Sequence, residues 1–314
     1  MVKILVTGAA GFIGSHLVEA LASKGHQIIA IDALLDNLYP SEQKIQNWKM
    51  IEKIGSSVER REIDLRKPLE SAEIADCDYI YHLAAMPGLS LSWEDMKLYI
   101  DCNLLATANL VKASNPNKLK RFFHISTSSV YGANVSGDEN SALIPISPYG
   151  VTKLASENLV SAFSKANGLP YSIFRLFSVY GPRQRSDMAF NIFTRKLLAG
   201  EVINNYGNGT QSRTNTYVSD VVDGLVSALE HSEIGEIYNL CGNEQANVLE
   251  IIDMLAKLTN RTPILNFMAE RLGDQQMTKS VAQKAQAKLG FKPKVNLLEG
   301  LARQVEWQLG NFQG

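Results

Sequence analysis

A tyrosine and a lysine lie four residues apart in the segment SPYGVTKLASE, at Tyr149 and Lys153. In a helix, residues at this spacing share one face, and Pro148, directly before the tyrosine, is typical of a first helical turn. A phenol with an unperturbed pKa of about 10 is a poor base at neutral pH, but a neighbouring ammonium favours the phenolate. The pair is therefore a candidate for removing a proton from an alcohol. Taken alone, the same spacing also fits an ordinary aromatic residue and a solvated lysine.

A glycine-rich turn separates the first apolar run, KILVT, from a helical pattern. Its three glycines are Gly8, Gly11 and Gly14. Such a turn lets the backbone approach a pyrophosphate, and the helix that follows supplies unpaired N–H groups. Asp32 ends the next apolar run, where its carboxylate can accept hydrogen bonds from an adenosine ribose and would repel a 2′-phosphate. The turn therefore predicts dinucleotide binding, with NAD favoured over NADP. Asp64 and Leu65, after the third run, are predicted to contact the adenine.

Short apolar runs alternate with helical patterns through the first half of the chain. Runs of this kind are typical of strands buried on both faces of a parallel sheet. They predict an α/β fold with a doubly wound parallel sheet of the Rossmann type. The expected strands cover residues 3–8, 26–32, 57–64, 78–85, 120–132 and 170–181, and the expected helices cover 12–25, 41–55, 95–114 and 147–168.

The character of the sequence changes after Gly181, where polar, turn-rich and arginine-bearing segments separate short elements. This change predicts a NAD-binding domain over residues 1–180 and a smaller, mainly substrate-binding C-terminal lobe over 181–314. Some segments of the lobe are expected to return to the first domain, because EIYNL (236–240) reads as another strand of the main sheet. Ligand pockets often form between such units.

The bulk composition favours a soluble, cytoplasmic protein. The chain has 314 residues, 20% of them charged, with a net charge of -1 and no block of like charge. Neither a nucleic-acid nor a membrane partner is therefore expected. The three cysteines fit no zinc spacing and read as buried small residues of a reducing compartment, and the scattered histidines predict no metal site. These residues are Cys77, Cys102, Cys241, His16, His26, His82, His124 and His231.

Several motifs, in this order, resemble the extended short-chain dehydrogenase/reductase family, and in particular its nucleotide-sugar epimerases. They are TGAAGFIGSHL, YHLAA, STSSVYG, SPYGVTK, RLFSVYGPRQRSDMAF and KAQAKLGFKP. The stretches GPRQRSDMA and DALLDNLYP are most similar to UDP-glucuronic acid 4-epimerases. The resemblance implies NAD as cofactor, a UDP-sugar as substrate, and a homodimer built on the helices at 95–114 and 149–166.

The resemblance also assigns roles to individual residues. It makes Tyr149 and Lys153 catalytic, with Lys153 also holding the nicotinamide ribose. Thr127 takes the position of the family's catalytic serine or threonine. The implied cofactor-binding set further includes Phe12, Ile13, Leu83, Ala84, Ala85 and Asn103.

The residues near the substrate favour epimerisation at C4 over elimination. Ser128 and Ser129 stand where related dehydratases have an Asp–Glu pair and decarboxylases have a glutamate, and neither serine is a strong acid or base. Ser178 replaces the asparagine of galactose-type epimerases. The resemblance places Arg185 against a uronate carboxylate, which a bidentate guanidinium suits. We hypothesise that Arg185 and these three serines keep the carboxylate out of the alignment that loses CO2 from a 4-keto uronate.

Two further arginines, Arg213 and Arg271, match family residues that bind the diphosphate. Two departures from the family pattern leave the identity of the substrate's sugar undecided. The chain has RTNTYVSD where relatives generally have RDFTYVDD, and Ser90 stands where relatives often have an arginine. The favoured activity is an isomerase that interconverts UDP-glucuronate and UDP-galacturonate. The alternatives are a 4-epimerase for UDP-glucose or a UDP-N-acetylhexosamine, and a non-catalytic NAD- or nucleotide-sugar-binding protein.

Overall fold

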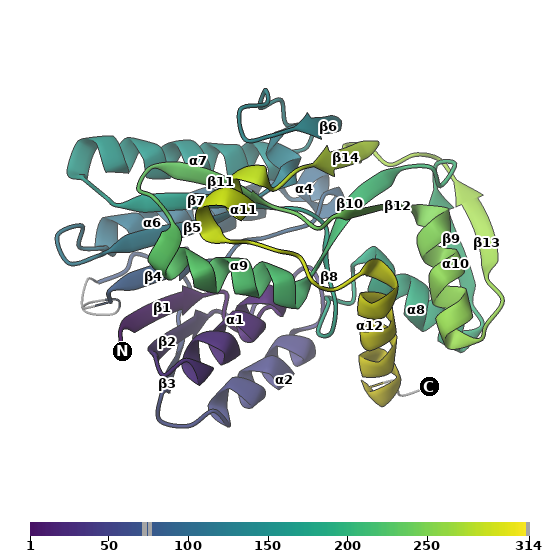
Figure 1. The fold of residues 1–314 in the computed structure, drawn as a ribbon, viewed down its shortest axis with the longest axis horizontal. Helices are drawn as coiled ribbons and strands as arrows, with labels where there is room; N and C mark the ends of the chain where they lie inside the picture. Colours follow the sequence, from purple (N-terminus) through teal and green to yellow (C-terminus); the bar gives the residue numbers. More distant parts are fainter. Residues whose placement is uncertain (71–73, 75–76, 312–314) are drawn as a thin grey trace.

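The computed structural model describes residues 1–70, 74 and 77–311. Its centre is a seven-stranded sheet with the order β11-β7-β5-β4-β1-β2-β3 (Figure 1), in which every neighbouring pair is parallel. The strands are β1 (Lys3–Thr7), β2 (Gln27–Asp32), β3 (Val58–Glu62), β4 (Tyr79–His82), β5 (Arg121–Thr127), β7 (Tyr171–Leu176) and β11 (Glu236–Leu240). The order reverses between β1 and β4, which confirms the doubly wound fold and marks the edge where ligands bind.

Both faces of the sheet are buried, as the continuous apolar runs predict. Along β1, Ile4 and Val6 belong to one hydrophobic core and Leu5 belongs to another, because successive side chains of a strand point to opposite faces. On one side α1 (Phe12–Ser23) packs against α9 (Val218–His231) and α2 (Ser41–Glu52). On the opposite side α6 (Ala106–Ala113) packs against α7 (Pro148–Asn167) (Figure 1).

The helix that carries Tyr149 and Lys153 begins and ends as its sequence predicts. The Gly150 N–H donates to the Ser147 side chain over 3.1 Å, which caps the first turn of α7, and Pro148 follows the cap. Gly168, with φ +72°, ends the helix in the left-handed conformation that glycine favours.

The observed strands are shorter than the predicted ones, and two of them break beside the ligand-binding edge. The strand expected over 120–132 ends at Thr127, because the chain turns into a 3₁₀ helix at Ser128–Val130. The strand expected over 170–181 is interrupted at Phe177 and Ser178. β7 stays in the main sheet, whereas β8 (Val179–Tyr180) pairs with β10 (Ser212–Tyr217) in a second sheet.

The helix expected over 95–114 is not a uniform α-helix. It consists of α5 (Met96–Tyr99), a π-helical segment (Ile100–Leu105) and α6. Such segments are rare and are frequent at functional sites. The helical periodicity of the sequence did not reveal this segment.

Two small sheets and several helices lie beside the main sheet (right in Figure 1). The C-terminal part supplies most of them, and β6 (Asn134–Gly137) and β8 join the larger of the two sheets from earlier in the chain. β11 returns to the main sheet and pairs with β7, as the EIYNL segment predicts. None of the helices within the described residues is long and apolar enough to cross a membrane. The remaining elements are α4 (Ser90–Glu94), α8 (Ala189–Ala199), β9 (Val202–Tyr206), β12 (Glu244–Asn247), α10 (Val248–Thr259), β13 (Ile264–Met268), β14 (Met277–Ser280), α11 (Gln283–Leu289) and α12 (Leu297–Asn311).

Candidate active site

A cavity of about 420 Å³ lies at the carboxyl ends of the parallel strands. Its walls come from residues that end or follow these strands, together with the start of α1 and α7, so the topology brings them together. Most of the residues predicted for the cofactor and for catalysis line it. These are Gly8, Gly11, Phe12, Ile13, Gly14, Asp32, Asp64, Leu65, Leu83, Ala84, Ala85, Thr127, Tyr149 and Lys153. Ser178 and Arg185, predicted to bind the substrate, line it as well.

The glycines of the first turn are required by close backbone approach. Gly8 has φ +69°, and a Cβ atom there would lie 2.8 Å from the backbone nitrogen of Ala84. A Cβ atom on Gly14 would lie 2.1 Å from the Gly8 carbonyl oxygen. Gly11 precedes α1 and offers no side-chain cap, which leaves first-turn N–H groups for an anion. The cradle fits the pyrophosphate of a dinucleotide.

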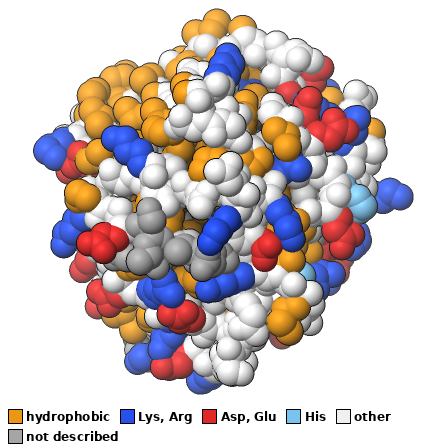
Figure 2. Space-filling model, turned by 90° about the vertical axis from the view of Figure 1, so that its left-hand side faces the viewer, with side chains coloured by type: hydrophobic (Ala, Val, Ile, Leu, Met, Phe, Trp, Pro, Cys, Tyr) orange, Lys and Arg blue, Asp and Glu red, His pale blue; other side chains and the backbone are white. Residues whose placement is uncertain are grey.

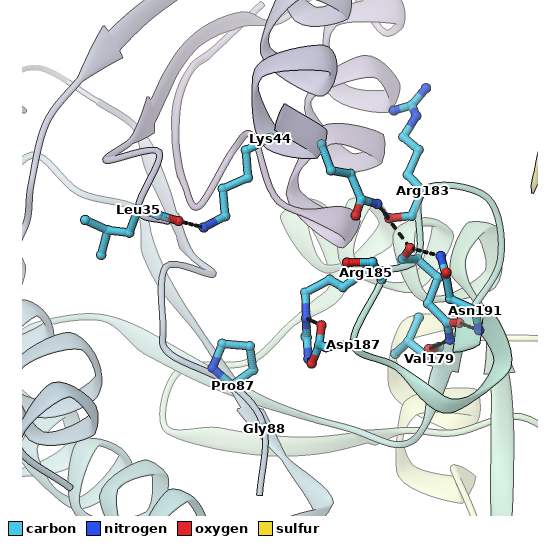
Figure 3. Close-up of polar contacts among 12 residues, drawn as sticks. Leu35, Lys44, Pro87, Gly88, Val179, Arg183, Arg185, Asp187 and Asn191 are labelled. Carbon is cyan, nitrogen blue, oxygen red and sulfur yellow. Dashed lines mark hydrogen bonds and ion pairs between the residues drawn. The ribbon is translucent and has the colours of Figure 1, made fainter. Parts of the chain in front are cut away.

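Asp32 is held at the end of β2 by two backbone N–H groups. Its carboxylate accepts from Ala10 over 3.0 Å and from Leu34 over 2.9 Å, while burial raises its pKa above the usual value. Lys44, which sequence reasoning missed, lines the same cavity and donates to the Leu35 carbonyl (Figure 3). Its positive charge opposes the rise in the pKa of Asp32.

The carboxylate predicted to contact the adenine already has a partner. Asp64 forms a two-pronged ion pair with Arg66, at 2.9 Å and 2.8 Å from the guanidinium nitrogens. Asp64 and Leu65 still line the cavity. An adenine could therefore contact the Leu65 side chain, but it could contact the Asp64 carboxylate only through oxygen lone pairs that Arg66 does not use.

Tyr149 and Lys153 both line the cavity, and burial changes the pKa of each. Burial raises the pKa of the Tyr149 phenol, opposed by a hydrogen bond with Thr127 and then by the charge of Arg185. Lys153 is 3% exposed, and burial lowers its pKa to about 8, opposed by the charge of Glu157. Lys153 donates to the Ile125 carbonyl over 2.7 Å. The influences that oppose burial at Tyr149 do not include the charge of Lys153, so the lowering of the phenol pKa by the lysine that the four-residue spacing suggests is not observed.

Asn103 does not line either large cavity and acts instead on the backbone around it. From the π-helical segment, its side chain accepts from the Met86 N–H over 2.7 Å and donates to the Met86 carbonyl over 3.1 Å. It also contacts the Thr152 hydroxyl over 3.0 Å. Asn103 thus ties the loop after β4 to α7 beside Lys153.

A second cavity, of about 830 Å³, adjoins the first and is lined largely by the C-terminal part. Ser178 and Arg185 line both cavities, and Arg213 and Arg271 line the second. Ser128 and Ser129 lie in the 3₁₀ turn, where they are 6% and 8% exposed, and line neither cavity.

Two of the three predicted substrate arginines carry a carboxylate partner that sequence reasoning missed. Arg185 holds Asp187 in a fork, with its Nε and Nη2 atoms 2.9 Å and 3.0 Å from the two carboxylate oxygens (Figure 3). Arg213 donates to Asp274 over 2.8 Å. Arg271 instead lies over the Tyr206 ring, 3.5 Å from its centroid. The pairing of Arg185 with Asp187 could have been expected from the sequence, because the two residues are only two positions apart. No sequence pattern indicates the contact of Arg213 with Asp274 or that of Arg271 with Tyr206.

The loop that carries Arg185 is anchored to the cofactor side of the molecule. Gln43 on α2 donates to the carbonyls of Arg183 and Gln184 over 2.9 Å and 3.1 Å. Arg183 has φ +66°, which a residue other than glycine rarely adopts, and its guanidinium pairs with Glu19 on α1 over 2.8 Å. These contacts hold a strained turn in place.

The two histidines near the site are buried, and each contacts a hydroxyl group. His82 contacts the Thr7 hydroxyl over 2.9 Å, and His124 contacts the Ser156 hydroxyl over 3.0 Å. Within residues 1–70, 74 and 77–311, no three His, Cys, Asp or Glu side chains are grouped so that they could hold a metal ion.

A doubly wound sheet, a glycine cradle at its switch point and a Thr/Tyr/Lys set in one cavity define an enzyme of the extended short-chain dehydrogenase/reductase class. The sequence comparison agrees, because the profile of the NAD dependent epimerase/dehydratase family matches residues 4–241. The chain belongs to this family.

Three similar proteins span the whole chain. A Bacillus subtilis protein named as an uncharacterized UDP-glucose epimerase is 38% identical, over 99% of both chains. UDP-glucuronate 4-epimerase 3 of Arabidopsis thaliana is 31% identical, over 99% of this chain and 77% of its own length. The crystal structure of UDP-glucuronic acid 4-epimerase from Bacillus cereus, in complex with UDP-glucuronic acid and NAD, is 39% identical, with a TM-score of 0.95 over 99% of this chain and 100% of that one.

Proposed function

We propose that this enzyme interconverts UDP-glucuronate and UDP-galacturonate by inverting the configuration at C4. The observation that carries the proposal is Arg185, a fork-shaped cation that lines both the cofactor cavity and the adjoining cavity. A guanidinium at that junction suits the carboxylate of a uronic acid. The whole-chain similarity to a UDP-glucuronic acid 4-epimerase supports the same substrate.

Tyr149 is the proposed base that takes the proton of the C4 hydroxyl and later returns it. Thr127, hydrogen-bonded to the phenol, orients that proton and the substrate oxygen. Bound NAD would supply the hydride acceptor for C4 and the donor for the return of that hydride. Lys153 holds a positive charge beside the phenol and binds the nicotinamide ribose. Return of the hydride to the opposite face of the 4-keto sugar requires no further acid or base.

The carboxylate must be restrained, because a 4-keto uronate is a β-keto acid that loses CO2 readily. Arg185 and Ser178 are the proposed restraints, since both line the cavity that holds Tyr149. Ser128 and Ser129, in the turn that follows Thr127, line neither cavity, and neither is a strong acid or base that could drive elimination. Replacing Arg185 by a neutral residue should therefore raise the share of UDP-pentose among the products.

The second cavity is the proposed site of the UDP group. Arg213 and Arg271 line it from different segments, which suits a dianionic diphosphate. We retain the division into a NAD-binding domain over 1–180 and a mainly substrate-binding lobe over 181–314 as part of this proposal. The origin of the residues that line the two cavities supports it.

The proposed assembly is a homodimer in the cytoplasm. Large apolar side chains are exposed along the two expected dimer helices, among them Met96, Ile100, Leu105 and Val151. Figure 2 shows hydrophobic side chains gathered at the upper left, the side of the molecule that carries α7. A reducing compartment fits the three cysteines, all of which are buried.

A redox-neutral assay tests the activity. The purified protein is incubated with UDP-glucuronate, UDP-glucose or UDP-N-acetylglucosamine, without added NAD, and the products are identified by NMR. Turnover of UDP-glucuronate to UDP-galacturonate as the preferred reaction supports the proposal. Preferred turnover of UDP-glucose would support the alternative that the name of the Bacillus subtilis relative suggests. Turnover of none of the three would support a binding protein.

A further inference from the structure

A buried ion pair lies one helical turn beyond Lys153. Glu157 follows Lys153 by four residues on α7 and therefore shares its face of the helix. Its carboxylate pairs with Arg175 of β7, and the two side chains are only 4% and 1% exposed. Buried pairs of this kind add little net stability, because desolvation offsets their attraction. Their position beneath a catalytic lysine points to another role.

Both oxygens of the Glu157 carboxylate are engaged. Oε1 accepts from Arg175 Nε over 3.1 Å and from the Ser126 hydroxyl, and Oε2 accepts from Arg175 Nη2 over 2.7 Å. Lys153 instead donates to the Ile125 carbonyl over 2.7 Å. Glu157 thus acts on Lys153 as a fixed negative charge rather than as a direct hydrogen-bond partner.

Arg175 is itself held rigidly from its far side. Its Nη1 donates to the Tyr131 hydroxyl over 2.9 Å, and its guanidinium lies 4.8 Å from the centroid of that ring. The Tyr131 hydroxyl donates onward to Asn239 on β11 over 2.8 Å. The chain of contacts therefore runs from the cofactor cavity, through Ser126, to the edge of the main sheet.

We propose that Glu157, clamped by Arg175, is a positioning residue that keeps Lys153 an ammonium while leaving its remaining N–H groups free for ligands. A direct Lys153–Glu157 bond would supply the charge but draw the ammonium away from Tyr149. An unpaired Glu157 would be free to form that bond. Because Arg175 holds the Glu157 carboxylate, Glu157 supplies negative potential to Lys153 without forming a hydrogen bond with it. The inference rests on the proposed role of Lys153 and does not depend on the identity of the sugar.

The other groups that face Lys153 do not supply this charge. Tyr149 shares its helix, while His82 on β4 and His124 on β5 face it from the sheet. Burial, reinforced by the charge of Lys153, lowers the pKa of His82 to about 3 and that of His124 well below its usual value, so both are neutral at physiological pH. Glu157 is the group that opposes the lowering of the Lys153 pKa by burial.

The test measures the pKa of Lys153 directly in the purified protein, without substrate. Protein with ¹³Cε-labelled lysine is titrated by NMR, and a Lys153→Arg variant identifies the signal. Glu157→Gln should lower this pKa by about one unit or more. Arg175→Gln frees Glu157 to approach Lys153 and should raise it. Asp253→Asn removes the carboxylate of an exposed i,i+4 pair with Lys257 on α10 and should leave it unchanged.

Opposite shifts in the two variants support the proposal, because a purely structural ion pair would not move the Lys153 pKa in opposite directions. Shifts in the same direction, or none, would overturn it. If Glu157→Gln does not fold because Arg175 is left unpaired, the double variant Glu157→Gln/Arg175→Gln replaces it. Loss of the nearer charge should still lower the pKa in that variant, and an unchanged value would refute the proposal. Failure of the UDP-glucuronate assay would not affect this measurement.

Discussion

Replacing Arg185 by glutamine tests the basis of the proposed substrate choice. In the native protein the guanidinium holds Asp187 through its Nε and Nη2 atoms. No hydrogen bond to another part of the described chain engages its Nη1 atom, which leaves that group available for a substrate carboxylate. Glutamine keeps a polar side chain but removes both the charge and the fork.

The expected effect follows from the partial burial of this arginine, which is 17% exposed. Truncating one partner of a buried, hydrogen-bonded charge pair costs about 2–5 kcal/mol, and residual solvent screening favours the lower half of that range, about 2–3 kcal/mol. A barrier raised by this amount lowers kcat/KM for UDP-glucuronate by about 30- to 150-fold. UDP-glucose has no carboxylate, so its kcat/KM should change much less.

The assay compares kcat/KM for UDP-glucuronate and UDP-glucose in both proteins and records the share of UDP-pentose by NMR. The matched variant Arg185→Gln/Asp187→Asn separates two contributions. Arg185→Gln alone leaves the Asp187 carboxylate unpaired, where it would repel a uronate, so the double variant should recover part of the loss. A folded Arg185→Gln protein whose preference for UDP-glucuronate is unchanged would refute the reasoning.

Four further predictions concern the cofactor, the base, the lysine and the assembly. Gly14→Ala should abolish NAD binding, measured as nucleotide released on denaturation, because its Cβ would lie 2.1 Å from a backbone oxygen, whereas Gly310→Ala has open space and should retain it. Tyr149→Phe should keep the cofactor but lose turnover by about 10²- to 10⁴-fold; near-normal kcat would contradict its role. Because the pKa of Lys153 is lowered to about 8, its ammonium is present below that pH and lost above it, so activity should fall as pH rises through 8. A flat pH–rate profile between 7 and 10 would count against this. Val151→Glu should give monomers by light scattering if α7 lies at the dimer interface.

The sequence predicted the fold well because the relevant signals are local. Continuous apolar runs identified the strands, and glycines with a terminal aspartate identified the nucleotide edge, since backbone geometry alone demands these residues there. The spacing of Tyr149 and Lys153 was enough to place both on one face of a capped helix. Errors fell where the chain leaves a strand. At Ser128 it turns into a 3₁₀ helix, and after Ser178 it pairs with a second sheet, and no local pattern marks either change.

By itself the sequence determined the order of elements and the glycine cradle, and it supplied the residues proposed for catalysis. Only the tertiary structure decided which charges meet: Lys44 near Asp32, Asp274 on Arg213, and Glu157 clamped by Arg175. Hydrophobic periodicity and turn-forming residues act over a few positions, so they can be recognised in the sequence alone. An ion pair between a helix and a distant strand depends on the packing register of both elements, which exists only once the whole sheet has formed.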